Sequence, residues 1–309
     1  MYVMRILYQK YQNWGNMNYM QRKIITYILL IILFYGSLVF AQTAQTVFIS
    51  FFPEEIRQGD PFMAQIDSAK ISSIKKLTFN GKRMGIFLYQ EKPTALIPVD
   101  LNKKAKTYEL RVELADGNII KKDVVIVQRD KKETPLGIPE KLGGNTKTSQ
   151  NKLVSTLNED NKKLAGLRTN GKSLWKEKFI APLRQIVVTS PYGNSRKTGE
   201  YAIPHKGTDY KAPEGTEILA INRGVVRFAK TLRNHGKTIV IDHGQGVMSF
   251  YLHLSKFKVK KGVVVERGKV IALSGATGYT LGAHLHFGLR INDIAIDPEK
   301  FFELFKDTN

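Results

Sequence analysis

Residues 275–287 read GATGYTLGAHLHF, a glycine-rich turn that runs into two histidines spaced one residue apart. In a β-strand, residues i and i+2 point to the same face, so His284 and His286 are predicted to project together. About eighty residues upstream, residues 205–209 read HKGTD and offer His205 and Asp209. Two imidazoles on one face, together with a distant histidine and aspartate, can supply the ligands of one zinc ion. From this spacing alone, either His284 or His286 could be the ligand.

The chain around this stretch is predicted to be an antiparallel, all-β domain. Almost no helical periodicity is present from residue 179 onward, and the domain is placed at residues 179–309. Short apolar or alternating runs predict its strands; they lie at residues 218–220, 224–228, 238–241, 248–252, 263–265, 270–273 and 284–289.

The region before it is also predicted to be β. Runs at 62–66, 76–79, 108–114 and 124–127 are separated by turn signals, of which Asn80-Gly81 is typical of a two-residue hairpin. Short strands at this spacing favour an immunoglobulin-like β-sandwich, placed at residues 42–130. Because no histidine or acidic cluster occurs there, we interpret it as a spacer or interaction module.

A change of composition separates the two domains. Residues 129–148 are rich in Lys, Gly, Thr and Pro, which predicts a flexible linker. Leucines at roughly helical spacing over residues 149–167 predict a surface helix packed on the second domain. The interval 131–178 is therefore expected to be a linker that carries one helix.

Composition limits the kinds of site and partner. The chain of 309 residues has no cysteine and only 6 histidines, so thiolate zinc sites and disulfides are excluded and any metal must be held by histidine and carboxylate. The net charge of +21 favours a polyanionic partner, which is nucleic acid, an anionic membrane or an acidic polymer such as a bacterial wall. The alternative is that a lysine-rich surface only keeps the protein soluble.

The N-terminus is typical of an exported protein. Arg22 and Lys23 precede an apolar run at 24–40, which ends in Val39-Phe40-Ala41 before Gln42. This pattern predicts that residues 1–41 are a secretory signal peptide, or an uncleaved membrane anchor through residues 24–40. Export makes nucleic acid an improbable partner and moves the polyanion hypothesis to the cell wall, in the periplasm or elsewhere in the cell envelope.

Six short segments of the C-terminal half occur together in one known family. They read SPYG (190–193), HKGTD (205–209), APEGT (212–216), DHG (242–244), YLHL (251–254) and GAHLH (282–286). In this order and at these spacings, residues 179–301 resemble the lysostaphin-type, LytM-like zinc metallopeptidases that cut peptidoglycan. The resemblance implies a compact β-sheet core.

The resemblance also implies roles for five residues. It places His205, Asp209 and His286 on one zinc ion per chain, and it leaves His253 and His284 as imidazoles that handle the proton of the attacking water. The function it implies is a zinc-dependent endopeptidase that hydrolyses the stem or bridge peptides of peptidoglycan. The alternative is a non-catalytic, wall-binding activator or scaffold on the same fold.

Two further histidines lie outside this set. His243, between a predicted strand and the turn 244–246, is interpreted as a turn-stabilising residue. His235, in a predicted loop, is assigned no role.

Overall fold

The computed structural model describes residues 17–39, 46–167 and 171–306. The chain divides into two compact units, residues 1–46 and 47–309, which are treated separately. In its described part, the first unit consists of helix α2 (Tyr19–Val39). Phe40 and Ala41 of the predicted cleavage site lie outside the described residues. Across the described ranges, we find no helix with the length and apolar character needed to span a membrane.

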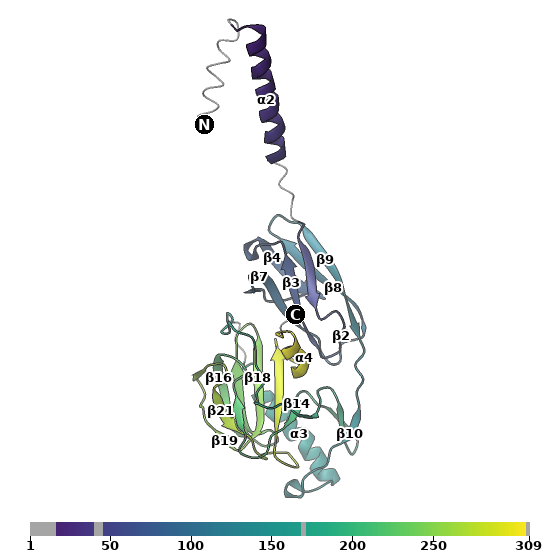
Figure 1. The fold of residues 1–309 in the computed structure, drawn as a ribbon. Helices are drawn as coiled ribbons and strands as arrows, with labels where there is room; N and C mark the ends of the chain where they lie inside the picture. The colour runs from purple at the N-terminus through teal and green to yellow at the C-terminus, as the bar shows by residue number, and fades with distance from the viewer. Residues whose placement is uncertain (1–16, 40–45, 168–170, 307–309) are drawn as a thin grey trace. The chain divides into compact units, whose positions relative to one another are not determined.

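Residues 47–127 form two β-sheets around one hydrophobic core (Figure 1). The strands of the first sheet, in spatial order, are β1 (Phe48–Phe52), β3 (Pro61–Asp67), β7 (Lys92–Pro98) and β6 (Phe87–Tyr89). Those of the second are β2 (Ile56–Arg57), β9 (Ile119–Val127), β8 (Lys106–Leu114), β4 (Ile74–Phe79) and β5 (Lys82–Arg83), and the short helix η2 (Ile71–Ser73) precedes β4. Phe62 joins the two sheets because its ring packs edge-on against that of Phe79 at 5.3 Å.

The predicted hairpin between β4 and β5 is confirmed. Asn80 and Gly81 have φ values of 49° and 74°, the left-handed conformations that a tight two-residue turn requires at both positions. The strands predicted in this region from alternating residues are likewise present.

The C-terminal region is built on one large antiparallel sheet, as predicted. Its strands, in spatial order, are β11 (Val188–Ser190), β14 (Thr208–Lys211), β22 (His284–Ile291), β18 (Val247–Leu254), β17 (Gly236–Asp242), β16 (Gly224–Leu232) and β20 (Val264–Val265), and β23 (Ile294–Ile296) also pairs with β22. A smaller sheet holds β15 (Glu217–Leu219), β21 (Val270–Leu273) and β19 (Lys256–Phe257). The helix α4 (Pro298–Glu303) follows β23.

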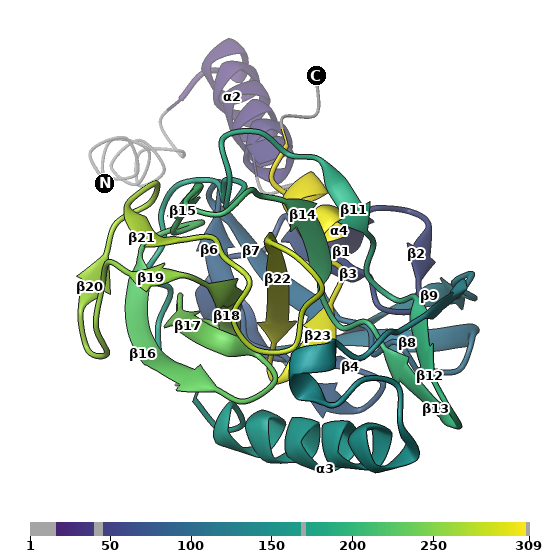
Figure 2. The same cartoon turned by 90° about the horizontal axis from the view of Figure 1, so that it is seen from below.

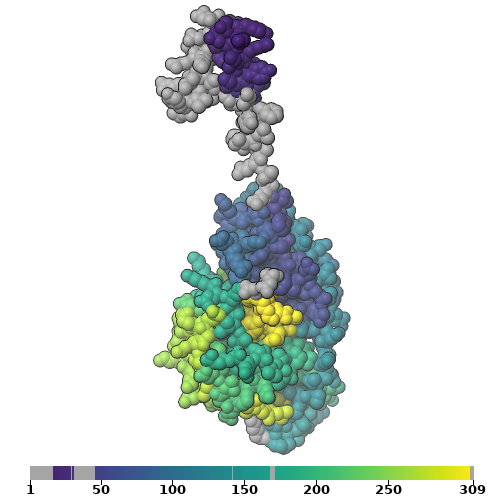
Figure 3. Space-filling view, viewed as in Figure 1, coloured from purple at the N-terminus to yellow at the C-terminus, as the bar shows by residue number. Residues whose placement is uncertain are grey.

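The two β regions share hydrophobic contacts within the unit 47–309. Met63, Phe87 and Leu96 of the first region belong to the same buried cluster as Trp175 and the core of the main sheet. Figure 3 shows the C-terminal residues, in yellow, next to residues of the first β region. A backbone hydrogen bond of 2.8 Å from Asp297 to Gly59 joins the two regions there.

Part of the predicted flexible linker is an ordered strand instead. β10 (Glu133–Pro135) pairs in parallel with β12 (Ser195–Thr198), which pairs with β13 (Tyr201–Pro204). The cause lies at Arg129, whose partly buried guanidinium contacts Asp60 of the first β region and lies 3.0 Å from Asp297 of the C-terminal region. This ion-pair network fixes the start of the segment, a tertiary effect that its composition does not reveal.

The predicted helix in this interval is confirmed as α3 (Lys147–Lys163), which follows the short helix η3 (Glu140–Leu142). Thr146 caps its N-terminus by accepting a 3.2 Å hydrogen bond from the Ser149 N–H. Figure 2 shows α3, in teal, along one edge of the C-terminal region. Asn151 of α3 contacts Tyr201 of β13 at 2.7 Å, so the helix is held against the hairpin beside the predicted site.

Candidate metal centre

Strands β14 and β22 bring Asp209 and His286 directly opposite each other. The two residues are partners in the antiparallel register, and His286 Nδ1 lies 2.7 Å from Asp209 Oδ1. Along β22, Leu285 and Phe287 are fully buried while His284 and His286 are partly exposed, so the predicted alternation is confirmed. The HxH pattern therefore presents both imidazoles on the face away from the core.

His205 reaches the same point from the segment that leads into β14. Its Nε2 lies 3.1 Å from both Asp209 Oδ1 and His286 Nδ1. Its Nδ1 lies 2.9 Å from the carbonyl of Pro191. Because a carbonyl can only accept, Nδ1 carries the proton and the Nε2 lone pair points into the cluster.

The donor atoms of these three residues fit a zinc ion. One ligand atom from each lies within 4.8 Å of the others. A tetrahedral zinc ion with bonds of about 2.1 Å would separate its ligand atoms by about 3.4 Å, close to the 2.7 to 3.1 Å found between these atoms. Neutral nitrogens and a carboxylate are ligands that zinc prefers, and a carbonyl partner on the second nitrogen of His205 is the usual support for a metal ligand.

His253 and His284 stand beside this cluster with their rings 4.9 Å apart. Each places Nδ1 at 2.9 Å from a backbone carbonyl, that of Thr277 for His253 and that of Gly282 for His284. By the same reasoning, each Nδ1 carries the proton and each Nε2 is left to accept one. His284 Nε2 lies 3.8 Å from Asp209 Oδ1, so this basic nitrogen faces the cluster.

The protonation states of the cluster suit metal binding. Burial alone would raise the pKa of Asp209, but its hydrogen bonds with His205 and His286 outweigh burial and hold this pKa well below its usual value. Burial lowers the pKa of His286 to about 4. Burial and the neighbouring histidines His284 and His286 hold the pKa of His253 well below its usual value. The carboxylate is therefore charged and these two imidazoles are neutral at neutral pH.

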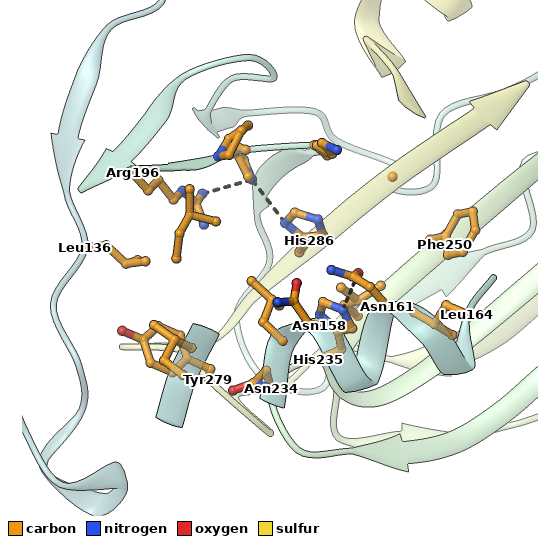
Figure 4. A pocket seen from close by; sticks show the side chains of 18 of the residues that line it. Leu136, Asn158, Asn161, Leu164, Arg196, Asn234, His235, Phe250, Tyr279 and His286 are labelled. Atoms are coloured by element: carbon orange, nitrogen blue, oxygen red, sulfur yellow. Dashed lines mark hydrogen bonds between the residues drawn. The ribbon is translucent and has the colours of Figure 1, made fainter. Parts of the chain in front are cut away.

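A cavity of about 380 Å³, lined by apolar and polar side chains, adjoins the cluster. Figure 4 shows its two sides, with His286 and Arg196 on one side and Asn158 and Asn161 of α3 on the other. Apolar side chains with polar groups on both sides are a lining that suits a ligand site.

Sequence reasoning did not identify Arg196 of β12 as part of the site. Its guanidinium forms an ion pair with Asp209, and its Nη2 lies 2.9 Å from His205 Nε2. Arg196 and a metal ion therefore compete for the lone pair of His205. The sequence around Arg196 contains no local pattern that indicates a role in the site, because only the hairpin β12–β13 brings Arg196 to the cluster.

The other histidines differ from the predicted site residues. His243 is fully buried, with contacts of 2.9 Å to the Arg223 carbonyl and 2.8 Å to Ser249 Oγ, which agrees with a stabilising role next to its turn. His235, which was assigned no role, has its backbone carbonyl 3.0 Å from the N–H of His253.

Comparisons with known proteins agree with this geometry. Residues 203–298 match the model of peptidase family M23, so the resemblance stated from the six segments is confirmed there. Peptidoglycan DD-endopeptidase ShyB of Vibrio cholerae is 39% identical over 116 residues, 37% of this chain and 27% of that protein. DD-carboxypeptidase/endopeptidase Mpg of Neisseria meningitidis is 37% identical over 120 residues, 38% of this chain and 28% of that protein.

A solved structure resembles more of the chain. A crystal structure from Pseudomonas aeruginosa assigned to peptidase M23 matches with a TM-score of 0.61 and 25% identity, over 81% of this chain and 96% of that one. By contrast, the chain spans about a quarter of the length of the curated relatives that it matches.

Proposed function

We propose, on the premise that residues 203–298 form a peptidase M23 domain, that this protein is a zinc-dependent endopeptidase acting on the peptide cross-links of peptidoglycan. The observation that carries the proposal is the convergence of His205, Asp209 and His286 within 4.8 Å, with two further imidazoles beside them. The name of one relative, peptidoglycan DD-endopeptidase ShyB, supports peptidoglycan as the substrate.

The ligands in this proposal are His205, Asp209 and His286. A zinc ion bound to them would supply a Lewis acid that polarises the scissile carbonyl and lowers the pKa of water to about 7. The Asp209 carboxylate offsets part of the positive charge of the ion. The carbonyl of Pro191 holds the His205 ring so that its Nε2 faces the ligand site, and this fixes the direction of one ligand before metal arrives.

His253 and His284 are the proposed proton-handling residues. Both rings are held through Nδ1 by backbone carbonyls, so each Nε2 has a defined direction. A neutral imidazole can accept a proton from the attacking water at Nε2, and the imidazolium so formed can donate that proton to the oxyanion of the tetrahedral intermediate or to the leaving amine. Because Nε2 is unprotonated in both rings, which lie 4.9 Å apart, either ring can take the first proton.

The proposal extends to the location and the remaining regions of the chain. A peptidoglycan substrate places the C-terminal domain outside the cytoplasm, and the apolar run at 24–40 is proposed to direct export, as a signal peptide or as an anchor. The two-sheet region 47–127 is proposed to be an immunoglobulin-like spacer. The net charge of +21 would favour binding to the anionic wall.

Mass spectrometry of the muropeptides released from purified sacculi tests this function. The full chain with zinc is expected to convert cross-linked dimers into monomers with the mass gain of one water per bond cut, and a chelator is expected to stop the release. Sacculi that keep all their cross-links in the presence of zinc-loaded protein would contradict the proposal and favour a non-catalytic wall-binding role.

A further inference from the structure

The helix α3 lies outside residues 203–298 but takes part in the site. It contributes Leu153, Leu157 and Asn161 to the wall of the cavity that His286 also lines. Figure 4 shows Asn161 and His286 there. A surface helix that only covered the domain would have no need for a buried charge. α3 nevertheless carries one, Asp160, which is 1% exposed.

The Asp160 carboxylate holds the turn between β16 and β17. Its Oδ2 accepts a 2.7 Å hydrogen bond from the N–H of Asn234 and lies 3.4 Å from the N–H of His235. Lys163 Nζ lies 4.0 Å from the other carboxylate oxygen, Oδ1. Burying a carboxylate is costly unless donors satisfy it, so the helix and the turn are fixed to each other. A second contact of 2.9 Å, from the Asn234 amide to Thr156 Oγ1, supports the same attachment.

This turn, held by Asp160, contacts the backbone of His253. The carbonyl of His235 accepts a 3.0 Å hydrogen bond from the N–H of His253. His253 has a φ of 61°, a left-handed conformation that a residue with a side chain adopts only where its surroundings impose it. The backbone hydrogen bond from the turn is therefore one of the contacts that maintain this conformation.

The same turn also supports the group that orients the His253 ring. The Thr277 carbonyl, which accepts from His253 Nδ1, lies against Gly236, where an added Cβ would be 2.2 Å from that oxygen. The Lys237 N–H donates to Thr277 Oγ1 at 2.9 Å. Both the backbone and the ring of His253 are thus held by residues 235–237 and their contacts.

We propose that Asp160 is a positioning residue of the active site, which acts through residues 234–237, the β16–β17 turn and the start of β17, to fix the backbone and ring of His253. The inference rests on the proposed function, because it concerns the proton-handling role of His253. It assigns to α3 a part in turnover as well as in the shape of the cavity. Asp160 itself touches none of the five site residues.

The test compares Asp160→Asn and Asp160→Ala with Glu159→Gln in the full chain. Glu159 is the exposed neighbour on α3, so its variant controls for the loss of one negative charge on the same helix. Soluble cross-linked muropeptide dimers serve as the probe, and kcat and KM are measured well below the melting temperature of each variant. Asp160→Asn is the milder change and keeps the test usable where Asp160→Ala does not fold.

Asp160→Ala is expected to lower kcat by about ten- to a hundredfold, with KM changed by less than about twofold and zinc content unchanged, because a small displacement of an oriented catalytic group affects turnover more than binding. Asp160→Asn is expected to fall between Asp160→Ala and wild type, and Glu159→Gln is expected to match wild type. An unchanged or raised kcat in both Asp160 variants, or a loss of zinc, would overturn the proposal.

Hydrogen exchange of the His253 amide separates this inference from the proposed function. In the Asp160 variants this amide is expected to exchange faster than in wild type, because its acceptor at His235 is released, and in Glu159→Gln its rate is expected to be unchanged. Unchanged exchange in Asp160→Ala would overturn the inference even if kcat fell. Faster exchange in a protein that cleaves no muropeptide would leave the positioning contact standing and remove the proposed function.

Discussion

Replacing Gly207 by alanine tests whether the metal centre depends on close packing between β14 and β22. A Cβ added at Gly207 would lie 2.6 Å from His286 Nε2 and 2.7 Å from the backbone oxygen of Phe287. The Phe287 oxygen is part of β22, whose register with β14 pairs Thr208 with Phe287. Turning the His286 ring relieves only the contact with its Nε2, and the contact with the Phe287 oxygen also requires the backbones of β14 and β22 to separate slightly. Both changes displace His286 from Asp209.

The expected cost follows from this overlap. Inserting a methyl group into a packed site typically costs about 1–3 kcal/mol. If most of this cost appears as displacement of His286 from the ligand site, the affinity for zinc falls by about 5- to 150-fold although no ligand has been replaced. The substitution is then expected to change the free energy of unfolding of the metal-free protein by less than it changes the free energy of zinc binding.

Zinc affinity is measured by competition with a chromophoric chelator, next to a thermal melt of the metal-free protein. Gly282→Ala is the matched control, since it lies on the rim of the same site and an added Cβ there has no atom within 4 Å. Gly207→Ala that folds and binds zinc as tightly as Gly282→Ala would refute the reasoning, because His286 would then not be held by contact with position 207.

Three other predictions concern the roles of single residues and regions. His253→Ala and His284→Ala are each expected to keep zinc and to lose about 10²–10⁴ in rate, whereas Asp209→Ala is expected to lose both, as measured by elemental analysis and muropeptide release. Burial lowers the pKa of His243 to about 4. As the pH falls, this histidine is therefore protonated in the unfolded chain before it is protonated in the folded protein. About 3 kcal/mol of stability that is present above pH 6.5 is lost as the pH falls towards 4. Denaturant titrations at several pH values are expected to show that the free energy of unfolding falls less steeply with pH in His243→Gln than in wild type. The same dependence on pH in both proteins would show that His243 is not the source of this loss. Residues 42–130 expressed alone are expected to unfold cooperatively and to release no muropeptide, and release by this fragment would show that it contains a hydrolytic site.

The sequence predicted much of the metal centre because its residues lie in short local patterns. The alternation of β22 follows directly from a period of two, so the common face of His284 and His286 could be predicted without knowing the strand's neighbours. The family resemblance then chose His286 over His284 as the ligand, and this choice stays a prediction; in the structure His286 Nδ1 lies 2.7 Å from Asp209 Oδ1.

What could not be predicted depends on contacts between distant segments. Arg196 comes to the cluster only because β12 and β13 form a hairpin beside it, and its spacing from Asp209 follows no local rule. The leucine spacing of α3 predicted a helix but could not show that it would line the cavity. The pairing of β10 with β12 could not be predicted either, because it depends on Arg129 and its carboxylate partners, which lie far apart in sequence.

Anomalous diffraction at the zinc absorption edge, from crystals of the full chain grown with zinc, tests the central claim most directly. The account predicts one strong peak bonded to His205 Nε2, Asp209 Oδ1 and His286 Nδ1, with the Arg196 guanidinium displaced from His205. A peak between His253 and His284, or one that lacks any of the three predicted ligands, would contradict the account.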